Sequence, residues 1–262
     1  MTTRKYAPRL LGAAFLIVAF TSVGSGFLLM SAVGSGSISD ILVDISNRLT
    51  LMRLFILGDL VTSLGIIALA VLLYIVLNKQ NKIVAIVALG CWLTEAMALA
   101  MSKFGASALI PLSQEFVQAG APDHSYYQTL GEVLYSGVVV QLGQTTELLF
   151  YCFGGMLWYY LFYKSRYVPR VISLFGLTAV SVALVGLAFQ FLGHDVSIFV
   201  FLPILPFELT IGAWLMFRGM KDEIPDSVAH GVLAMTTPED TSMATLDEVE
   251  RFVRGAVPRV AS

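Results

Sequence analysis

The stretch QLGQTTELLFYCFGG, residues 141–155, places polar side chains inside a segment that is otherwise apolar enough to enter lipid. Its Gln144, Glu147 and Tyr151 are spaced i, i+3 and i+7, so on a helix they face the same side. The core of a bilayer offers no water to such groups, and they must therefore face protein or a hydrated cavity. The stretch predicts a membrane helix whose polar stripe is turned towards the centre of a bundle.

The composition of the whole chain is that of a membrane protein. Of its 262 residues, 57% are hydrophobic and only 13% are charged, whereas soluble domains are about 25% charged. The net charge is −2 and no basic patch with interleaved aromatic residues occurs, so nucleic acid is not an expected partner. Membrane lipids are the expected surroundings.

The sequence contains no pattern for a metal or a cofactor. Cys91 and Cys152 both lie in apolar segments, and neither belongs to a CxxC pair. No histidine lies deep in an apolar segment, and neither HExxH nor GxSxG occurs. We therefore expect no cofactor, no metal and no catalytic residue of these classes.

Six apolar segments follow one another along the chain. They predict an all-α, polytopic membrane protein built as a bundle of six transmembrane helices. The predicted spans are residues 10–30, 49–77, 83–101, 133–163, 171–192 and 197–217. The first resembles a signal peptide in its basic start, but its apolar run of about 20 residues exceeds the roughly 7–15 of such signals, and we expect a retained helix.

Two of the predicted connections are long. Residues 34–47 read as a Gly/Ser-rich loop, and residues 103–132 read as the longest loop, interrupted by Pro111 and Pro122. Within the second loop, residues 112–119 are a candidate for a short interfacial helix.

Lysines and arginines predict on which side of the membrane each loop lies. Ten occur at the N-terminus, in the second and fourth turns and at the start of the tail: Arg4, Lys5, Arg9, Lys79, Lys82, Lys164, Arg166, Arg170, Arg218 and Lys221. The opposite loops and their flanks hold three: Arg48, Arg53 and Lys103. Because positive loops stay in the cytoplasm, we expect a multi-pass protein of the cell (cytoplasmic) membrane with its N-terminus and C-terminus in the cytoplasm.

The polar tail, residues 220–262, is expected to be separate from the six-helix domain of residues 1–219. Within it, Thr245 and Glu248 form a capping-box pattern that opens a short amphipathic helix at about 245–255. Such a helix either docks on a protein partner or on the membrane surface, or frays without a role. The second alternative is favoured, because isolated helices this short are rarely stable in water.

Four of the predicted spans each carry one acid: Asp59, Glu95, Glu147 and Glu208. A charged carboxylate near the middle of the membrane costs roughly 2.5–3.5 kcal/mol, so four unpaired ones would cost on the order of 10 kcal/mol, comparable to the stability of a whole domain. Arg53, about 9 Å along the helix from Asp59, is the one basic side chain that the predicted spans offer as a counterion. The acids are therefore expected to be protonated, paired with a bound cation or hydrated.

Two interpretations of these acids remain open. They either gather around a cavity that binds protons, a cation or a cationic solute, or hydrogen-bond separately to neighbouring helices. The second is favoured for any single residue, whereas acids on four different spans support the first. The predicted polar cavity is lined by Arg53, Asp59, Glu95, Gln141, Gln144, Glu147, Tyr151 and Glu208.

Three stretches carry a resemblance to a known family: YKSRYVPRVISLFGL at residues 163–177, PFELTIGAWLMFRG at residues 206–219 and RLFILGDLV at residues 53–61. They resemble a bacterial family of six-span membrane proteins that is catalogued as a domain of unknown function, number 4386. The similarity extends from about residue 4 to residue 219. It implies six spans in a bacterial cytoplasmic membrane, and it implies no reaction.

The leading hypothesis for function is a proton- or cation-linked carrier of a small solute or lipid that uses the buried carboxylates. One alternative is a non-catalytic accessory or sensing subunit that uses the tail to hold a protein partner. Another is a membrane enzyme acting on a lipid or isoprenoid, with a glutamate as general base. The enzyme hypothesis would require paired acids that hold a metal at the membrane surface, and the sequence shows none.

Overall fold

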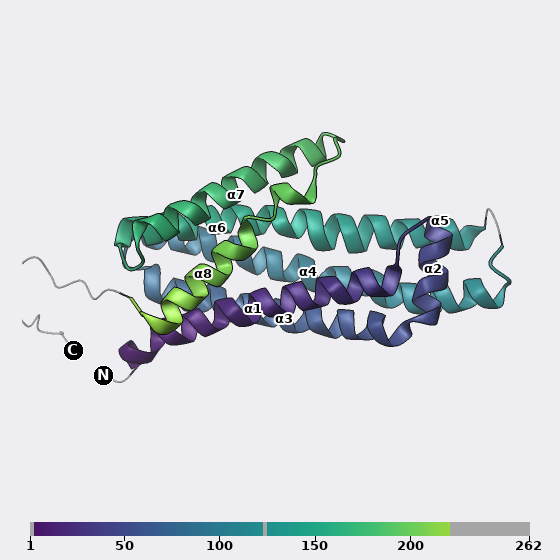
Figure 1. Ribbon diagram of the computed structural model, residues 1–262, viewed down its shortest axis with the longest axis horizontal. Coiled ribbons are helices and arrows are strands. Elements are labelled where there is room, and N and C mark those ends of the chain that lie inside the picture. Colours follow the sequence, from purple (N-terminus) through teal and green to yellow (C-terminus); the bar gives the residue numbers. More distant parts are fainter. Residues whose placement is uncertain (1–2, 123–124, 221–262) are drawn as a thin grey trace, which may run out of the picture. The chain divides into compact units, whose positions relative to one another are not determined.

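The computed structural model describes residues 3–122 and 125–220, and the regular structure of these residues is helical throughout (Figure 1). The first half of the chain forms α1 (Thr3–Val33), α2 (Ile38–Asn47), α3 (Leu49–Leu77) and α4 (Lys82–Gln118). The second half forms α5 (Tyr126–Glu132), the π-helix η1 (Val133–Thr146), α6 (Glu147–Ser165), α7 (Arg170–Phe191), the 3-10 turn η2 (Ile198–Val200) and α8 (Ile204–Phe217). The predicted tail helix at 245–255 lies outside the described residues.

Five segments of the described chain are long and apolar enough to cross a membrane, and they make this a multi-pass membrane protein. They are Pro8–Val33, Leu49–Leu77, Lys82–Gln118, Arg170–Phe191 and Ile198–Phe217. The remaining predicted span, residues 133–163, is helical but is not one of the five. Its apolar character is diluted by Glu147 and by the tyrosines of α6, and the span is divided between the π-helix η1 and α6.

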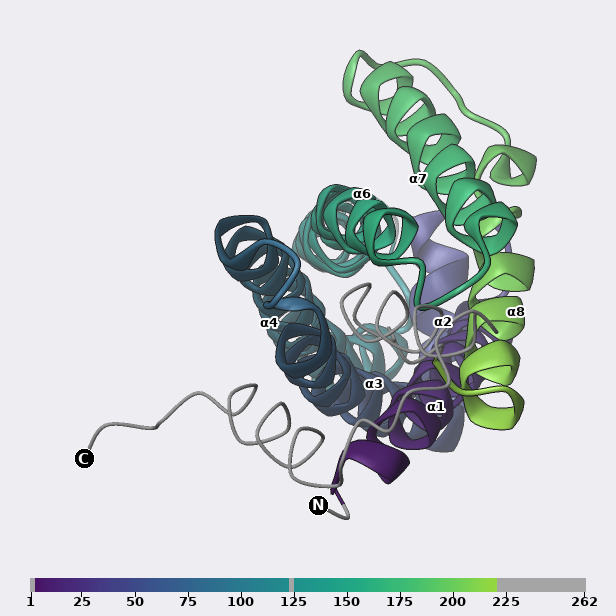
Figure 2. The ribbon, with the colours of Figure 1, turned by 90° about the vertical axis from the view of Figure 1, so that its left-hand side faces the viewer.

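The long helices form a ring in which each packs on two neighbours. α1 packs on α3 and α8, α4 packs on α3 and α6, and α7 packs on α6 and α8. Figure 2 shows the ring end-on, with α4 and α8 on opposite sides and α7 at the outer edge. The start of α1 and the end of α8 lie at the same end of the bundle (Figure 1), which we call the N-terminal end.

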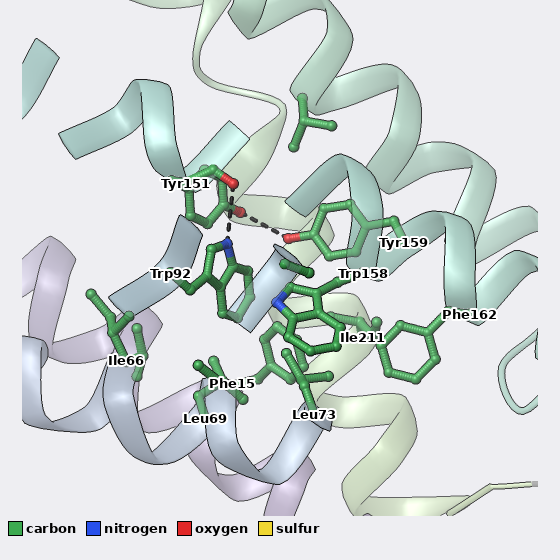
Figure 3. Close-up of a cluster of buried hydrophobic side chains, with 14 of the residues drawn as sticks. Phe15, Ile66, Leu69, Leu73, Trp92, Tyr151, Trp158, Tyr159, Phe162 and Ile211 are labelled. Carbon is green, nitrogen blue, oxygen red and sulfur yellow. Dashed lines mark hydrogen bonds between the residues drawn. The ribbon is translucent and has the colours of Figure 1, made fainter. Parts of the chain in front are cut away.

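The larger hydrophobic core occupies the interior between these helices. Trp92, Trp158 and Tyr159 are its largest members, and each is at most 2% exposed. The ring of Trp92 meets two others edge to face, that of Phe15 with centroids 6.3 Å apart and that of Trp158 with centroids 6.2 Å apart. Figure 3 shows side chains of α1, α3, α4, α6 and α8 meeting around these rings. Aromatic packing therefore fixes α1, α4 and α6 relative to one another.

Glycines allow α1 and α8 to approach closely. A Cβ at Gly12 would meet the backbone of Met216 and Gly212, and a Cβ at Gly212 would lie 2.9 Å from the side chain of Leu16. Helices in lipid gain little from hydrophobic association, so their packing depends on such close backbone approach. The position of α8 beside the other helices therefore rests on this glycine contact.

At the opposite end, the helices build a second hydrophobic core, and both loop predictions are wrong there. α2 fills most of residues 34–47, and α4 continues through Pro111 to Gln118. The reason is an apolar stripe that continues at helical spacing beyond the lipid-like part of α4. Its buried side chains pack with those of α2: Ala106, Leu109, Leu112 and Phe116 on α4, and Ile41, Leu42 and Ile45 on α2. The candidate interfacial helix at 112–119 is thus mostly the last part of α4.

A capping box explains why α2 begins where a loop was expected. The backbone N–H and the hydroxyl of Ser37 donate hydrogen bonds to the carboxylate of Asp40, at 2.8 Å and 2.7 Å, and the Ser37 hydroxyl accepts one from the Asp40 N–H. The hydrogen bonds from Ser37 to its charged form lower the pKa of Asp40. The helix start is thereby stabilised most fully when Asp40 is ionised.

We expect Gly12→Leu to destabilise the bundle by about 1–3 kcal/mol, the usual cost of overpacking, because the new side chain would enter the backbone of α8. The matched control is Gly24→Leu on the same helix, where a Cβ meets nothing within 4 Å and a change of at most about 0.5 kcal/mol is expected. Thermal unfolding of the purified variants in detergent measures both. Equal losses in the two variants would contradict a glycine-dependent contact between α1 and α8.

Candidate functional site

A cavity of about 330 Å³ lies among α1, α3, α4, η1, α6 and α8. Small-molecule sites in proteins have volumes of about 300–1,000 Å³. Much of its wall is apolar, from Val18, Leu29, Phe55, Ile66, Leu99, Leu148 and Ile204. The polar groups on this wall decide what the cavity can bind.

Most of the residues predicted to line a cavity are brought together here. Six of the eight line it: Asp59, Glu95, Gln144, Glu147, Tyr151 and Glu208. Asp59 and Glu95 are almost completely buried, with exposed fractions of 6% and 3%. Glu147 and Glu208 are half-buried. All four acids, from four different helices, therefore meet at one cavity.

Arg53 and Gln141 do not line the cavity, and both are exposed. Arg53 is six residues from Asp59, which on an α-helix turns it about 120° around α3, away from the face of Asp59. Gln141 lies within η1, where i→i+5 hydrogen bonding makes each turn wider than in an α-helix. This difference rotates Gln141 away from the face that Gln144 occupies.

The counterion of Asp59 is Lys103, which the sequence had placed in an external loop. The ammonium of Lys103 forms a salt bridge with Asp59, and the hydroxyl of Ser25 donates a hydrogen bond to the other carboxylate oxygen. Lys103 is 4% exposed and its Nζ lies 4.1 Å from the centroid of the Phe55 ring. The group ties α1, α3 and α4 together at the cavity wall.

A signal for Lys103 was present in the sequence. It lies eight residues after Glu95, close to two helical turns, so it continues the polar stripe once α4 is extended beyond residue 101. Ser25 carried no comparable signal, because a serine in an apolar helix usually bonds to its own backbone.

The part of the cavity nearest the N-terminal end is held by a chain of hydrogen bonds. The hydroxyl of Tyr151 donates to the carboxylate of Glu208 at 2.9 Å and lies 3.1 Å from the hydroxyl of Tyr159. The indole N–H of Trp92 donates to the carbonyl oxygen of Tyr151 at 3.1 Å, and their rings stack with centroids 5.9 Å apart (Figure 3). The aromatic core thus fixes the orientation of Glu208.

Glu95 has a carboxylate oxygen without a partner. Its Oε2 is buried and accepts no hydrogen bond from any described residue. More than about 90% of buried polar groups in proteins are hydrogen-bonded, so Glu95, a residue that lines the cavity, is short of one partner. Lys103 is the one basic residue among those that line the cavity, and it is already paired with Asp59.

The carboxyls are spread along the cavity and do not converge on one point. Within residues 3–122 and 125–220, no three His, Cys, Asp or Glu side chains are placed to hold a metal ion together. The arrangement offers separate contacts to the different parts of one ligand.

Removing one partner of the buried pair should be costly. We expect Lys103→Met to destabilise the protein by about 3–5 kcal/mol, because Asp59 is left charged and unpaired. Combining it with Asp59→Asn should recover most of that loss, which a double-mutant cycle of thermal unfolding in detergent measures. The control is Arg53→Met, an exposed base on α3, with an expected change of at most about 0.5 kcal/mol. If Lys103→Met costs no more than the control, the pair does not hold the helices together.

Comparison with known proteins gives the family and no function. No curated protein and no solved structure was found to match the chain. A family model described as "Domain of unknown function (DUF4386)" matches residues 10–219, which include every residue that lines the cavity. This confirms the resemblance seen in the three stretches of sequence, and the chain belongs to the DUF4386 family.

Proposed function

We propose that this protein is a proton- or cation-linked carrier whose cavity binds an organic cation, either a small solute or the head of a lipid. The observation that carries the proposal is the unpaired carboxylate oxygen of Glu95 at a cavity that two further acids, Glu147 and Glu208, also line. The ion pair of Lys103 and Asp59 leaves these three acids without a basic partner.

The charge balance of the cavity supports linkage between a cation and protons. A carboxylate in lipid is tolerated when it is protonated or paired with a cation. A cation that binds such a carboxyl takes the place of its proton, so one positive charge enters the cavity as one proton leaves. This exchange is the elementary step of a carrier that moves a cation in one direction and a proton in the other.

We also propose that the chain crosses the membrane six times, with the helix formed by α5, η1 and α6 as the fourth span and both termini in the cytoplasm. The ring supports this because α6 packs between α4 and α7, two of the candidate spans. The charge distribution supports it further, since Lys103 is an internal partner of Asp59 and is no longer counted among the loop residues. The membrane would be the bacterial cytoplasmic membrane, as the family resemblance implies.

Reporter fusions test the topology. Alkaline phosphatase fused after Ala121 should be active, because that connection is expected outside the cytoplasm, whereas fusion after Arg166 should give an inactive enzyme. A fluorescent protein that folds only in the cytoplasm should give the reverse result at the two sites. The same reporter activity at both positions would rule out the fourth span.

Neutral replacements of the unpaired acids test the carrier. In proteoliposomes that contain a pH-sensitive dye, we expect guanidinium, a permanently charged organic cation, to drive proton flux. Glu95→Gln and Glu208→Gln should lower that flux about tenfold, because each removes a charge-assisted contact, and Glu147→Gln should also lower it.

The matched control for these three replacements is Glu115→Gln, which changes an exposed acid of α4 that lies outside the cavity. It should leave the flux unchanged. If the three cavity variants fold normally and conduct as well as the control, the acids form a scaffold and the carrier proposal is wrong.

A further inference from the structure

The cavity opens sideways, between α1 and η1. Ser22 and Gly26 of α1 and Gln144 of η1 line it and yet are exposed. A Cβ at Gly26 would meet nothing within 4 Å, so no side chain of residues 3–122 and 125–220 covers the cavity there. α1 packs on α2, α3 and α8, while η1 packs on α4, α5 and α6. We call the two helices at this opening its lips.

The opening exists because α8 is short. With 14 residues, Ile204–Phe217, it extends about 21 Å, and in Figure 1 it runs obliquely from the middle of the bundle to the N-terminal end. Ile204 and Glu208, in its first turns, still line the cavity. Because α8 begins at Ile204, it does not lie between α1 and η1 on the side of Ile204 that faces away from the N-terminal end.

The depth of the opening places it in lipid. At about 1.5 Å per residue, Ser22 and Gly26 lie about 21 Å and 27 Å from Pro8 along α1. Gln144 lies at about 30 Å from the end of α6 by the same count. The hydrocarbon layer of a bilayer is about 30 Å thick. A molecule that passes between the lips therefore comes from the outer part of the acyl-chain layer or from its boundary with the headgroups.

The chemistry behind the opening is divided into two parts. Glu208 and Glu95, about 14 Å and 20 Å from the N-terminal end, provide carboxyl groups, and the unpaired oxygen belongs to Glu95. Leu29, Phe55 and Leu148 provide apolar wall. An anionic head would meet three carboxyl groups, and the one base that lines the cavity, Lys103, is already paired with Asp59. A ligand that satisfies both parts carries a positive head and an apolar chain.

We propose that the ligand is a single-chain cationic amphiphile, an amine or guanidine with an alkyl tail, which enters from the bilayer between α1 and η1. Its head binds Glu95 and Glu208, and its tail passes over Gly26 into the lipid. This inference names the substrate class of the proposed carrier and rests on that proposal. A cavity of about 330 Å³ holds the head and the start of one chain, and the rest of the chain remains between the lips.

A photoreactive amphiphile tests the geometry. The probe is dodecylguanidinium with a diazirine at the end of its tail, photolysed with the protein in lipid nanodiscs, and the labelled peptides are identified by mass spectrometry. We expect labels on α1 after Gly26 and on η1. Glu95→Gln should lower the labelled fraction about tenfold by removing the contact with the head. Labels confined to other helices would overturn the lateral route.

A matched pair of substitutions on α1 isolates the opening from the acids. Gly26→Leu should fill the space between the lips and lower labelling about tenfold, whereas Gly24→Leu adds the same side chain in open space, away from the cavity, and should leave labelling unchanged. Equal labelling of the two variants would overturn the inference, since access through the lips would then not matter.

Matched ligands separate this inference from the carrier itself. Guanidinium, which has no tail, should compete with the photoreactive probe at least about tenfold more weakly than dodecylguanidinium does. Dodecanol, which has the tail alone, should also compete poorly. If guanidinium drives proton flux in a Glu95-dependent way but competes as well as dodecylguanidinium, the carrier stands and the lipid-side route is wrong. If no cation drives flux while labelling depends on Glu95 and Gly26, the binding site stands and carriage is wrong.

Discussion

The buried salt bridge between Lys103 and Asp59 is the interaction on which the arrangement of the bundle depends. Removing two ions from water is compensated only when their geometry is good and their other hydrogen-bonding groups are satisfied. Here Ser25 supplies the second hydrogen bond to the carboxylate, and the Phe55 ring lies beneath the ammonium. Because the three polar groups come from α1, α3 and α4, satisfying the pair requires those helices to stand together. The pair also occupies Lys103, the one base that lines the cavity, so Glu95, Glu147 and Glu208 have no basic partner there.

The two sides of the cavity differ in rigidity because their polar groups differ in how well they are packed and hydrogen-bonded. On the side of Glu208, hydrogen bonds and stacked rings fix each polar group, and little can move without breaking the aromatic core. On the side of α1 and η1, Gly26 and Gln144 are both exposed, and a Cβ at Gly26 would meet nothing within 4 Å. A site with a fixed interior and an uncovered side can keep its binding geometry while its ligand exchanges, and this is what a carrier needs at each end of its cycle.

Much of this arrangement follows from side-chain periodicity, and the rest depends on features that hydropathy does not encode. The face shared by Gln144, Glu147 and Tyr151 follows from their spacing, and the helical, membrane-spanning class follows from the apolar runs. Hydropathy places the end of a span wherever polar residues begin, so it could not distinguish a loop from the part of α4 that continues into the second core. That error hid Lys103, and with it the counterion of Asp59. Arg53 was assigned that role because it was the nearest base along the chain, although its position on α3 turns it away from the cavity.

The π-helix explains the remaining difference at Gln141 and gives it a functional meaning. A run of 14 residues with i→i+5 hydrogen bonds is unusual, because π-helices mostly occur as single turns and frequently at functional sites. Within η1, Gly143 abuts Ser102 of α4 so closely that a Cβ would collide with its hydroxyl, while the next residue, Gln144, turns to the cavity. The wider turn thus allows one helix to pack tightly on α4 and to present an amide at the lip of the opening. A regular α-helix through the same residues would place Gln141 and Gln144 on nearly the same face. The position of this lip relative to α4 therefore depends on the backbone of η1 and not on the identity of its side chains alone.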